Sequence, residues 1–331
     1  MITLDGSHGG GQLLRTALSL SAVTQQPFTI KNIRGQREEQ GLKPQHVTAV
    51  HAVQQLCHAD VMGAHLGSKE LTFIPHQVEG GNFSFDIGTA GSTTLLLQTL
   101  LPVCLAEDRS TTITVTGGTD TLWCPPSVHF QQVFLEAVQR IGIAVSLDIT
   151  KYGFYPKGGG EMSLTIFPFD GFERIHFTER SALERVKVYC LASEHLQQKH
   201  VAERMVREFQ SIFPESQAVV KYVTTLSPGC LLHSVVQYQN YAIGEGLLGD
   251  VRLRAEHVGK TVALKTQTLM RQQGVDVYLG DQLLIYMALA GKGEILVPAV
   301  TEHMRTNAAV IEQFLPVKFT FEKHVISCRK I

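Results

Sequence analysis

Apolar and polar positions along this chain follow a recurring order: a short strand pattern, a glycine-rich turn, then a helical pattern. The copies are strand 2–5, turn 9–12 and helix 13–23; strand 83–87, turn 88–92 and helix 93–105; strand 112–116, turn 117–120 and a helix near 128–141. A fourth copy has a glycine turn at 280–282 before a helix over 283–290. Strands that alternate with helices at this spacing predict an α/β domain of repeated modules.

Residues 181–275 have a different pattern, which lacks the glycine turn. Strands are predicted at 185–192, 218–222 and 231–238, a charged amphipathic helix at 199–213 and a further helix at 251–271. We therefore predict a large repeated-module domain formed by residues 1–180 and 276–331. A small inserted α/β domain is predicted at 181–275.

Composition and charge narrow the classes of function. The chain has 331 residues, is 44% hydrophobic, and has no apolar run that approaches the roughly 18 residues of a membrane span. Its beginning lacks a basic signal-peptide pattern, so we expect a cytoplasmic protein without membrane association. The net charge of −1 gives no general attraction to nucleic acid, so any such contact needs a local patch. The six cysteines lack CxxC spacing, which favours reduced thiols over zinc or disulfides.

His303 is the leading catalytic candidate. It follows a strand pattern at 294–298 and lies in the first turn of a predicted helix that Thr301 caps. The apolar stripe of this helix leaves His303 and Asn307, four residues apart, together on another face. The positive end of the helix dipole favours a neutral, nucleophilic imidazole and attracts phosphate. Taken alone, a surface or capping histidine is the more frequent explanation.

Two segments carry the residues that suit phosphate. The glycines at 9–11 open a helix that carries Arg15, without the lysine of a P-loop or the spacing of a dinucleotide motif. A polar, basic stretch follows the strand at 28–30 and contains Arg34, Arg37, Gln45 and His46, with Glu38 and Glu39 among them. Guanidinium groups bind phosphate in a bidentate manner. A tight strand–helix connection and a solvated loop are the structural alternatives.

Two further segments suit a nucleotide. Gln98 lies in an otherwise apolar helix and needs a hydrogen-bond partner, which is either structural or the edge of an adenine or sugar. The stretch 278–282 offers the aromatic face of Tyr278 for stacking on a base, a flexible Gly280 and the carboxylate of Asp281. An N-cap role explains Asp281 equally well.

Together these segments resemble RNA 3′-terminal phosphate cyclases over nearly the whole chain. The motifs that carry the resemblance are Leu4-Asp5-Gly6 with the glycines and Arg15, Gly41-Leu42 with 45–50, Ala90-Gly91-Ser92 with 97–99, 117–120, Gly153-Phe154-Tyr155-Pro156 with a triple glycine, 281–283, and 303–307 with 314–316. The resemblance implies repeated βαβαββ modules and a small inserted α/β domain. It also implies conversion of an RNA 3′-phosphate to a 2′,3′-cyclic phosphate through a histidine–AMP intermediate formed from ATP.

By resemblance, His303 is the nucleophile. The ATP site is implied to include Gln98, Pro125, Tyr278, Leu279, Gly280, Asp281 and Gln282. The RNA phosphates are implied to contact Arg15, Arg34, Arg37, Gln45 and His46. A divalent cation, Mg²⁺ or Mn²⁺, is implied as a cofactor, RNA with a 3′-phosphate end as a partner, and a homo-oligomer stays open.

One departure concerns the metal. The family usually has a longer first loop with a glutamate before the triple glycine, whereas this loop is short and lacks it. The metal ligands are therefore left open, with His8 and Asp5 as substitutes. The rival functions are a non-catalytic cyclase-like RNA-binding protein of the ribosome-assembly type, an enolpyruvyl transferase, and a phosphohistidine enzyme that takes the γ-phosphate.

Overall fold

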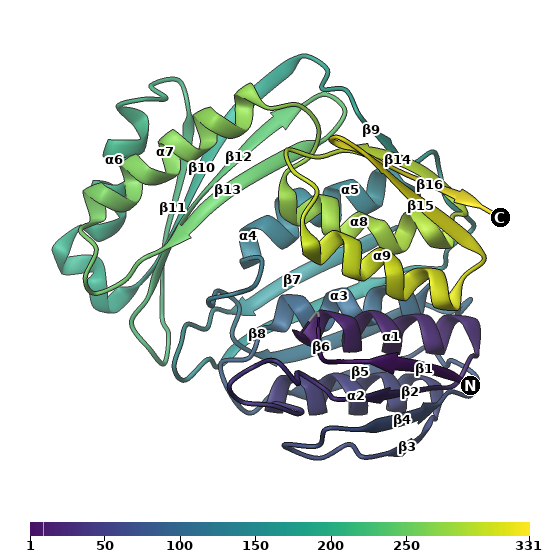
Figure 1. Cartoon of the computed structure of the whole chain (residues 1–331). Helices are drawn as coiled ribbons and strands as arrows, with labels where there is room; N and C mark the ends of the chain where they lie inside the picture. The colour runs from purple at the N-terminus through teal and green to yellow at the C-terminus, as the bar shows by residue number, and fades with distance from the viewer. Residues whose placement is uncertain (9) are drawn as a thin grey trace.

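The computed structural model describes residues 1–8 and 10–331. Within these residues the strands form four sheets of four strands each. Figure 1 shows helices gathered between three of the sheets, with the fourth sheet at the upper left under two helices of its own. Gly9, which belongs to the first predicted glycine turn, lies outside the described residues.

The first module has a parallel strand pair followed by a returning hairpin. Its elements are β1 (Ile2–Asp5), α1 (Gly10–Thr24), β2 (Phe28–Lys31), α2 (Pro44–Cys57), β3 (Asp60–Met62) and β4 (Leu71–Ile74). The strand order is β1-β2-β4-β3, with β1 parallel to β2 and the other pairs antiparallel. Helix α1 buries its apolar face against α2, α3 and α9, which explains its helical hydrophobic period.

The second module repeats this arrangement. Its elements are β5 (Asn82–Asp86), α3 (Thr93–Cys104), β6 (Thr111–Gly117), α4 (Ser127–His129), the π-helix η1 (Phe130–Phe134), α5 (Leu135–Arg140), β7 (Val145–Lys151) and β8 (Gly160–Ile166). The order β5-β6-β8-β7 matches the first sheet position by position. Alternate residues of β6 and β8 are buried, so one face of this sheet packs on the helices.

The third module is split by a long insertion. It consists of β9 (His176–Phe177), α8 (Val277–Leu289), β14 (Lys292–Leu296), α9 (Glu302–Phe314), β15 (Val317–Glu322) and β16 (Val325–Lys330). Strand β9 lies parallel to β14, and the order β9-β14-β16-β15 again has the same pattern. The implied βαβαββ modules are therefore confirmed, as is the α/β fold class.

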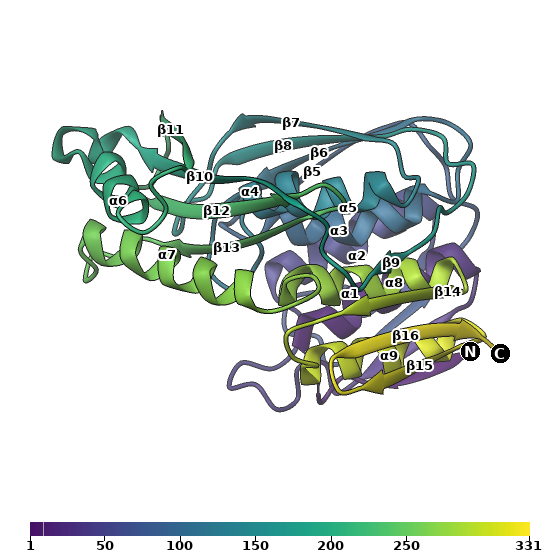
Figure 2. The same ribbon diagram turned by 90° about the horizontal axis from the view of Figure 1, so that it is seen from above.

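The insertion lies between β9 and α8. Its elements are β10 (Leu183–Ser193), the 3-10 helix η2 (Glu194–Lys199), α6 (Val201–Gln210), β11 (Gln217–Val223), β12 (Cys230–Tyr238), β13 (Ala242–Leu248) and α7 (Ala255–Arg271). Both long helices cover one face of the sheet, as Figures 1 and 2 show. Val188, Phe209 and Val262 belong to a hydrophobic cluster of their own between the two layers. Strand β13, which the sequence pattern did not predict, completes this sheet.

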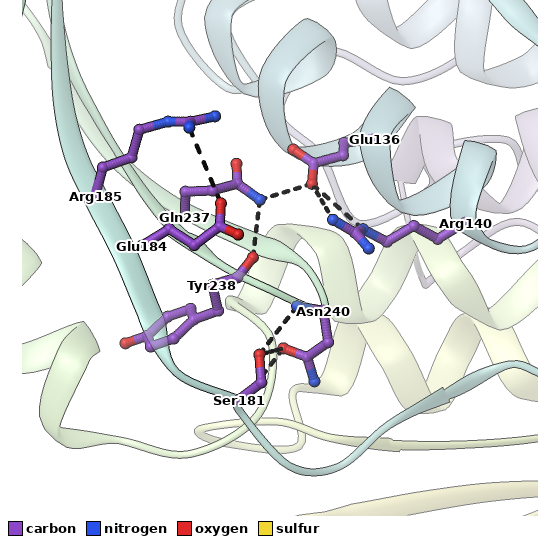
Figure 3. Close-up of polar contacts among 8 residues, drawn as sticks. All are labelled: Glu136, Arg140, Ser181, Glu184, Arg185, Gln237, Tyr238 and Asn240. Carbon is purple, nitrogen blue, oxygen red and sulfur yellow. Dashed lines mark hydrogen bonds and ion pairs between the residues drawn. The ribbon is translucent and has the colours of Figure 1, made fainter.

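Polar side chains connect the fourth sheet to the second module. Gln237 of β12 donates from Nε2 to Oε1 of Glu136 on α5 at 2.7 Å, and Arg140 donates from Nη2 to the same oxygen at 2.8 Å. Figure 3 shows these side chains meeting across the junction, with a Ser181–Asn240 hydrogen bond nearby. The division into domains at residues 181 and 275 stays a prediction, since this sheet also packs on the rest of the molecule.

One predicted element is wrong. The glycine turn expected at 280–282 lies inside α8, which begins at Val277. Asp276 is the N-cap of this helix, and its Oδ1 accepts from the backbone N–H of Leu279 at 2.9 Å. The six cysteines are free, as expected. Across the described residues, none of the helices has the length and apolar character needed to cross a membrane.

Candidate active site

A cavity of about 740 Å³ lies where α1, α3, α8 and the start of α9 meet. The loop after β2 and the loop between β6 and α4 complete its wall. Its lining includes Arg15, Arg34, Arg37, Gln45, His46, Gln98, Trp123, Cys124, Pro125, Tyr278, Asp281, Gln282, His303 and Asn307. Residues from all three modules thus converge on one space.

His303 lies at the open side of this cavity. The Thr301 hydroxyl caps α9 by accepting from the backbone N–H of Met304 at 3.2 Å, as the sequence predicted. Met304 is buried and anchors the first turn, whereas the His303 side chain is 58% exposed. A ring sealed in the core would have excluded a nucleophilic role, and this ring is accessible.

Asp281 faces the imidazole from α8. The His303 Nδ1 lies 3.6 Å from Asp281 Oδ2, which also accepts from Gln12 Nε2 at 2.5 Å. Asn307 Nδ2 lies 3.3 Å from Asp281 Oδ1, and Thr16 donates to Asn307 Oδ1 at 2.7 Å. The carboxylate is thereby held by groups on α1 and α9. A carboxylate opposite Nδ1 favours the tautomer with a proton on Nδ1, which leaves the Nε2 lone pair free.

Arg15 and His46 lie together at one end of the cavity, where both approach Gly11. His46 is almost fully buried, and its Nδ1 accepts from the backbone N–H of Lys43 at 3.1 Å. Burial, with the nearby charges of Arg15 and Arg34, lowers the pKa of His46 to about 3. Its ring is therefore neutral at pH 7, with the proton on Nε2 as a donor.

The arginines supply the positive charge at this end. Burial lowers the pKa of Arg15 to about 10 against the opposing effect of Asp281, so Arg15 remains charged at neutral pH. Burial and the charge of Arg37 also lower the pKa of Arg34. Glu39 pairs with Lys43, and neither Glu38 nor Glu39 is among the described residues of the lining. Arg34 also donates from Nη2 to the backbone carbonyl of Glu39 at 3.3 Å, so Glu39 lies beside the arginines without lining the cavity.

The opposite end of the cavity presents flat and amide groups. Tyr278 is half exposed and makes an edge contact with His129, with ring centroids 5.6 Å apart. Gln98 Nε2 and both amide atoms of Gln282 are buried without a hydrogen-bond partner among the described residues. Buried amides without partners are rare in folded proteins, and these line a cavity. Such groups suit the edge of a nucleobase or sugar.

Comparison with known proteins agrees with this geometry. A model of the family "RNA 3'-terminal phosphate cyclase" matches residues 7–321. The chain belongs to the RNA 3′-terminal phosphate cyclase family. It is 39% identical over 325 residues to "RNA 3'-terminal phosphate cyclase" of Koribacter versatilis, and the alignment covers 96% of this chain and 91% of that protein. A structural alignment with the enolpyruvyl transferase NikO of Streptomyces tendae covers 100% of this chain and 82% of NikO. The identity is 11% and the TM-score is 0.29, too low to support a shared fold or function.

Two residues that the cyclase resemblance implied for the ATP site do not line the cavity. Leu279 is fully buried in the main core. Gly280 packs under Val297 and Met304, where an added Cβ would lie 2.6 Å from Val297 Cγ1. The reason is helical register, since α8 turns positions 278, 281 and 282 to the cavity and 279 and 280 to the core. Asp276 followed by an apolar run was the sequence signal for this helix.

Several residues of the cavity were not assigned to the site from the sequence. Gln12 and Asn307 hold Asp281. The spacing of Asn307 from His303 had placed the two on one helix face, but it gave Asn307 no role. Cys124 also lines the cavity, and burial raises its pKa, so the thiol stays protonated near neutral pH. Trp123 had no signal beyond being the single tryptophan.

The metal ligands stay open. Among the described residues, Asp281 is the carboxylate that lines the cavity, and its oxygens already contact Gln12, Asn307 and His303. Asp5 and His8 lie instead at a second hollow of about 500 Å³, where Asp5 accepts from Ser7 and Asn32. No group of three or more acidic, histidine or cysteine side chains suited to a metal occurs in residues 1–8 and 10–331. These side chains do not form a carboxylate cage for a divalent cation.

Proposed function

We propose that this protein converts an RNA 3′-phosphate to a 2′,3′-cyclic phosphate at the expense of ATP. In the first step, His303 Nε2 attacks the α-phosphorus of ATP, a P–N bond forms and pyrophosphate leaves. A 3′-phosphate oxygen of the RNA then attacks the same phosphorus and releases the histidine. The 2′-hydroxyl finally attacks the RNA phosphorus, loses its proton and expels AMP. Covalent catalysis of this kind divides a difficult activation into easier transfers.

The observation that carries this proposal is the accessible His303 ring opposite a fixed carboxylate in a cavity that also holds an arginine cluster. Asp281 acts as a positioning residue in this scheme, since it touches the histidine and not the phosphorus. A protonated Nδ1 facing Asp281 keeps Nε2 as the attacking atom and stabilises the positive ring after attack. The 3.6 Å separation is expected to shorten when a ligand fills the cavity.

We assign the two ends of the cavity to different substrates. The base of ATP would lie between Tyr278 and Pro125, with the amides of Gln98 and Gln282 at its polar edge. The RNA 3′-phosphate would lie against Arg15, Arg34 and Arg37, where paired N–H groups suit phosphate oxygens. Gln45 and the Nε2–H group of the neutral His46 ring would complete this pocket.

A divalent cation would offset the charge of the triphosphate. We assign no step to it, because the described side chains offer it little beyond Asp281. The oxygens of the triphosphate and water would then supply most of its ligands.

The decisive experiment labels the protein with ATP. Protein incubated with ATP labelled at the α position should carry acid-labile label after denaturation, and ATP labelled at the γ position should leave none. His303→Ala should lose the label. His324→Ala is the matched control, because His324 is exposed on the β15–β16 turn and should leave labelling at the wild-type level. Label from the γ position would identify a phosphohistidine enzyme instead.

A second measurement addresses the RNA step. An RNA that ends in a 3′-phosphate should become resistant to phosphatase after incubation with the protein and ATP. The same RNA with a 2′-deoxy terminal sugar should stay sensitive, because no hydroxyl is available to close the ring. A folded protein that binds RNA and takes no label from ATP would favour the non-catalytic RNA-binding alternative.

A further inference from the structure

Trp123 lines the cavity and is nevertheless 95% exposed. It is the single tryptophan of the chain, and Leu122 beside it is 64% exposed. A tryptophan offers the largest aromatic face among the side chains and usually covers much of it by packing. The ring therefore stands at the open rim of the cavity, and the described fold leaves most of it uncovered.

The backbone around Trp123 holds the ring outward. Trp123 has a φ of 69°, in the left-handed region that bulky residues rarely adopt. The turn is closed at Cys124, whose Sγ lies 3.2 Å from the carbonyl of Thr121. Strain of this kind persists where the surroundings enforce it, and it is concentrated at ligand sites.

Buried groups fix both ends of this turn. Asp120, before it, is fully buried and accepts from the backbone N–H of Ser127 at 2.9 Å and from its hydroxyl at 2.8 Å. The carbonyl of Pro125, after it, accepts from the Thr94 hydroxyl at 2.8 Å. The exposed ring thus stands on a rigid base, which limits the entropy lost when a ligand covers it.

The position of the Trp123 ring at the rim favours the RNA over the mononucleotide as its ligand. A mononucleotide bound within the cavity already meets Tyr278, Pro125 and the amides of the inner wall. An RNA with its 3′-phosphate among the arginines must leave the cavity past the rim, and its unpaired bases have free faces. Proteins bind single strands by combining cationic groups for phosphate with aromatic rings for bases.

We propose that Trp123 is a stacking platform for the nucleobase at the 3′ end of the RNA substrate. This inference rests on the proposed cyclase function and adds to it a contact with the base of the RNA. Because stacking uses the flat face of the base, the platform accepts any of the four bases. It would raise the affinity for RNA and leave the α-phosphate chemistry to His303.

The single tryptophan makes a direct test feasible, since its fluorescence reports on this ring alone. His303→Ala protein, which should bind without turnover, is titrated with a short RNA that ends in a 3′-phosphate. The same RNA with an abasic terminal nucleotide, and ATP alone, are the comparison ligands. We expect strong quenching by the intact RNA, much less by the abasic RNA, and little by ATP.

Variants of the turn give an independent readout in the otherwise wild-type protein. Trp123→Ala should raise the KM for RNA about tenfold, equal to about 1.4 kcal/mol, which lies in the range for one aromatic–base stack. Trp123→Phe should recover part of this loss. Leu122→Ala, the matched removal of an exposed apolar side chain from the same turn, should bind RNA like the wild type.

Any of four results would overturn the inference. Quenching by ATP equal to that by RNA, or a rise in the KM for ATP in Trp123→Ala, would assign the ring to the nucleotide. RNA retained on filters by the protein without a change in fluorescence would remove Trp123 from the interface while the proposed function stands. Failure of the wild-type protein to bind RNA at all would defeat both.

Discussion

At the scale of single residues, His303 becomes informative through its neighbours. The chain has 14 histidines, and a helix-capping position is an ordinary place for one. What distinguishes this ring is the carboxylate of Asp281, which α8 brings to within 3.6 Å of Nδ1. Gln12 and Asn307 keep that carboxylate in one orientation, so the histidine faces a fixed charge.

We expect Asp281→Asn to slow the attachment of α-label from ATP about 100-fold or more, in the range of lost acid–base assistance. The amide keeps the shape of the side chain and removes the charge that stabilises the ring during attack. The Kd for ATP, measured by equilibrium binding, should change far less than the rate. Glu302→Gln alters an exposed carboxylate in the same turn as His303 and serves as the control. A wild-type labelling rate in Asp281→Asn would contradict the positioning role.

Most of the residues that sequence analysis assigned to the site do line the cavity. Arg15 was predicted from its place after a glycine turn, His46 from a polar stretch after a strand, and Gln98 from its place within an apolar helix, and these signals are local. Leu279 and Gly280 do not line the cavity, because the direction in which these positions face depends on where α8 begins. Trp123 was missed because exposure depends on the tertiary structure, which no local pattern reveals.

At the scale of elements, the pair α8 and α9 sets the geometry of the site. Gly280 permits their close approach, since an added Cβ would lie 3.0 Å from Met304 Cε and 2.6 Å from Val297 Cγ1. Met304 follows His303 directly, and Asp281 follows Gly280. The space around one glycine therefore controls the distance between the helices that carry Asp281 and His303.

Gly280→Ala should destabilise the protein by about 1–3 kcal/mol, the usual cost of overpacking. Helix propensity alone predicts the opposite sign, because alanine in a helix interior is favoured by about 1 kcal/mol. The free energy of unfolding of Gly280→Ala, measured by chemical denaturation, decides between these two expectations. Adding Val297→Ala should recover stability in the double variant, because it removes the nearest atom. Simple additivity of the two substitutions would show that Val297 is not the source of the strain.

Several strands and helices were predictable from the sequence because each has its own periodic pattern of apolar residues or its own capping residue. Strands β6 and β8 alternate strictly, and α9 carries its own cap at Thr301. Strand β9 has two residues and exists because β14 pairs with it, so it has no signal of its own. The π-helix at Phe130–Phe134 is likewise a consequence of packing.

At the scale of the whole molecule, a buried polar cluster joins the fourth sheet to the end of the cavity that Tyr278 lines. His129 Nε2 lies 3.1 Å from Asp276 Oδ1, whose other oxygen accepts from the backbone N–H of Gly244 on β13 at 3.1 Å. Burial acts to raise the pKa of Asp276, but His129 and the hydrogen bonds outweigh it and lower the pKa. His233 of β12 lies against the His129 ring and over Gly244 and Gly246.

This cluster gives the fold a defined response to acid. Burial, reinforced by His129, lowers the pKa of His233 from 6.5 to about 3. The unfolded chain therefore binds one more proton at this residue between about pH 6.5 and 3, so stability falls as the pH falls through that window. His233→Phe keeps a planar ring and should make the slope of stability against pH shallower by up to about 1.4 kcal/mol per pH unit. Denaturation from pH 4 to 6 measures it, and an unchanged slope would contradict a neutral, buried His233.

The contact between α1 and α9 also bears on the order of synthesis. Thr16 and Asn307 share a hydrogen bond although 291 positions separate them, and Figure 1 shows their helices side by side. A ribosome that adds 5–20 residues per second needs roughly 15–60 s between the two. During that interval the arginines and glycines of the first module can already be in place, whereas His303 has not yet been synthesised. Under the proposed function, the nascent chain would carry its phosphate-binding arginines before its nucleophile, and reaction with ATP would begin only when the last module docks on the first.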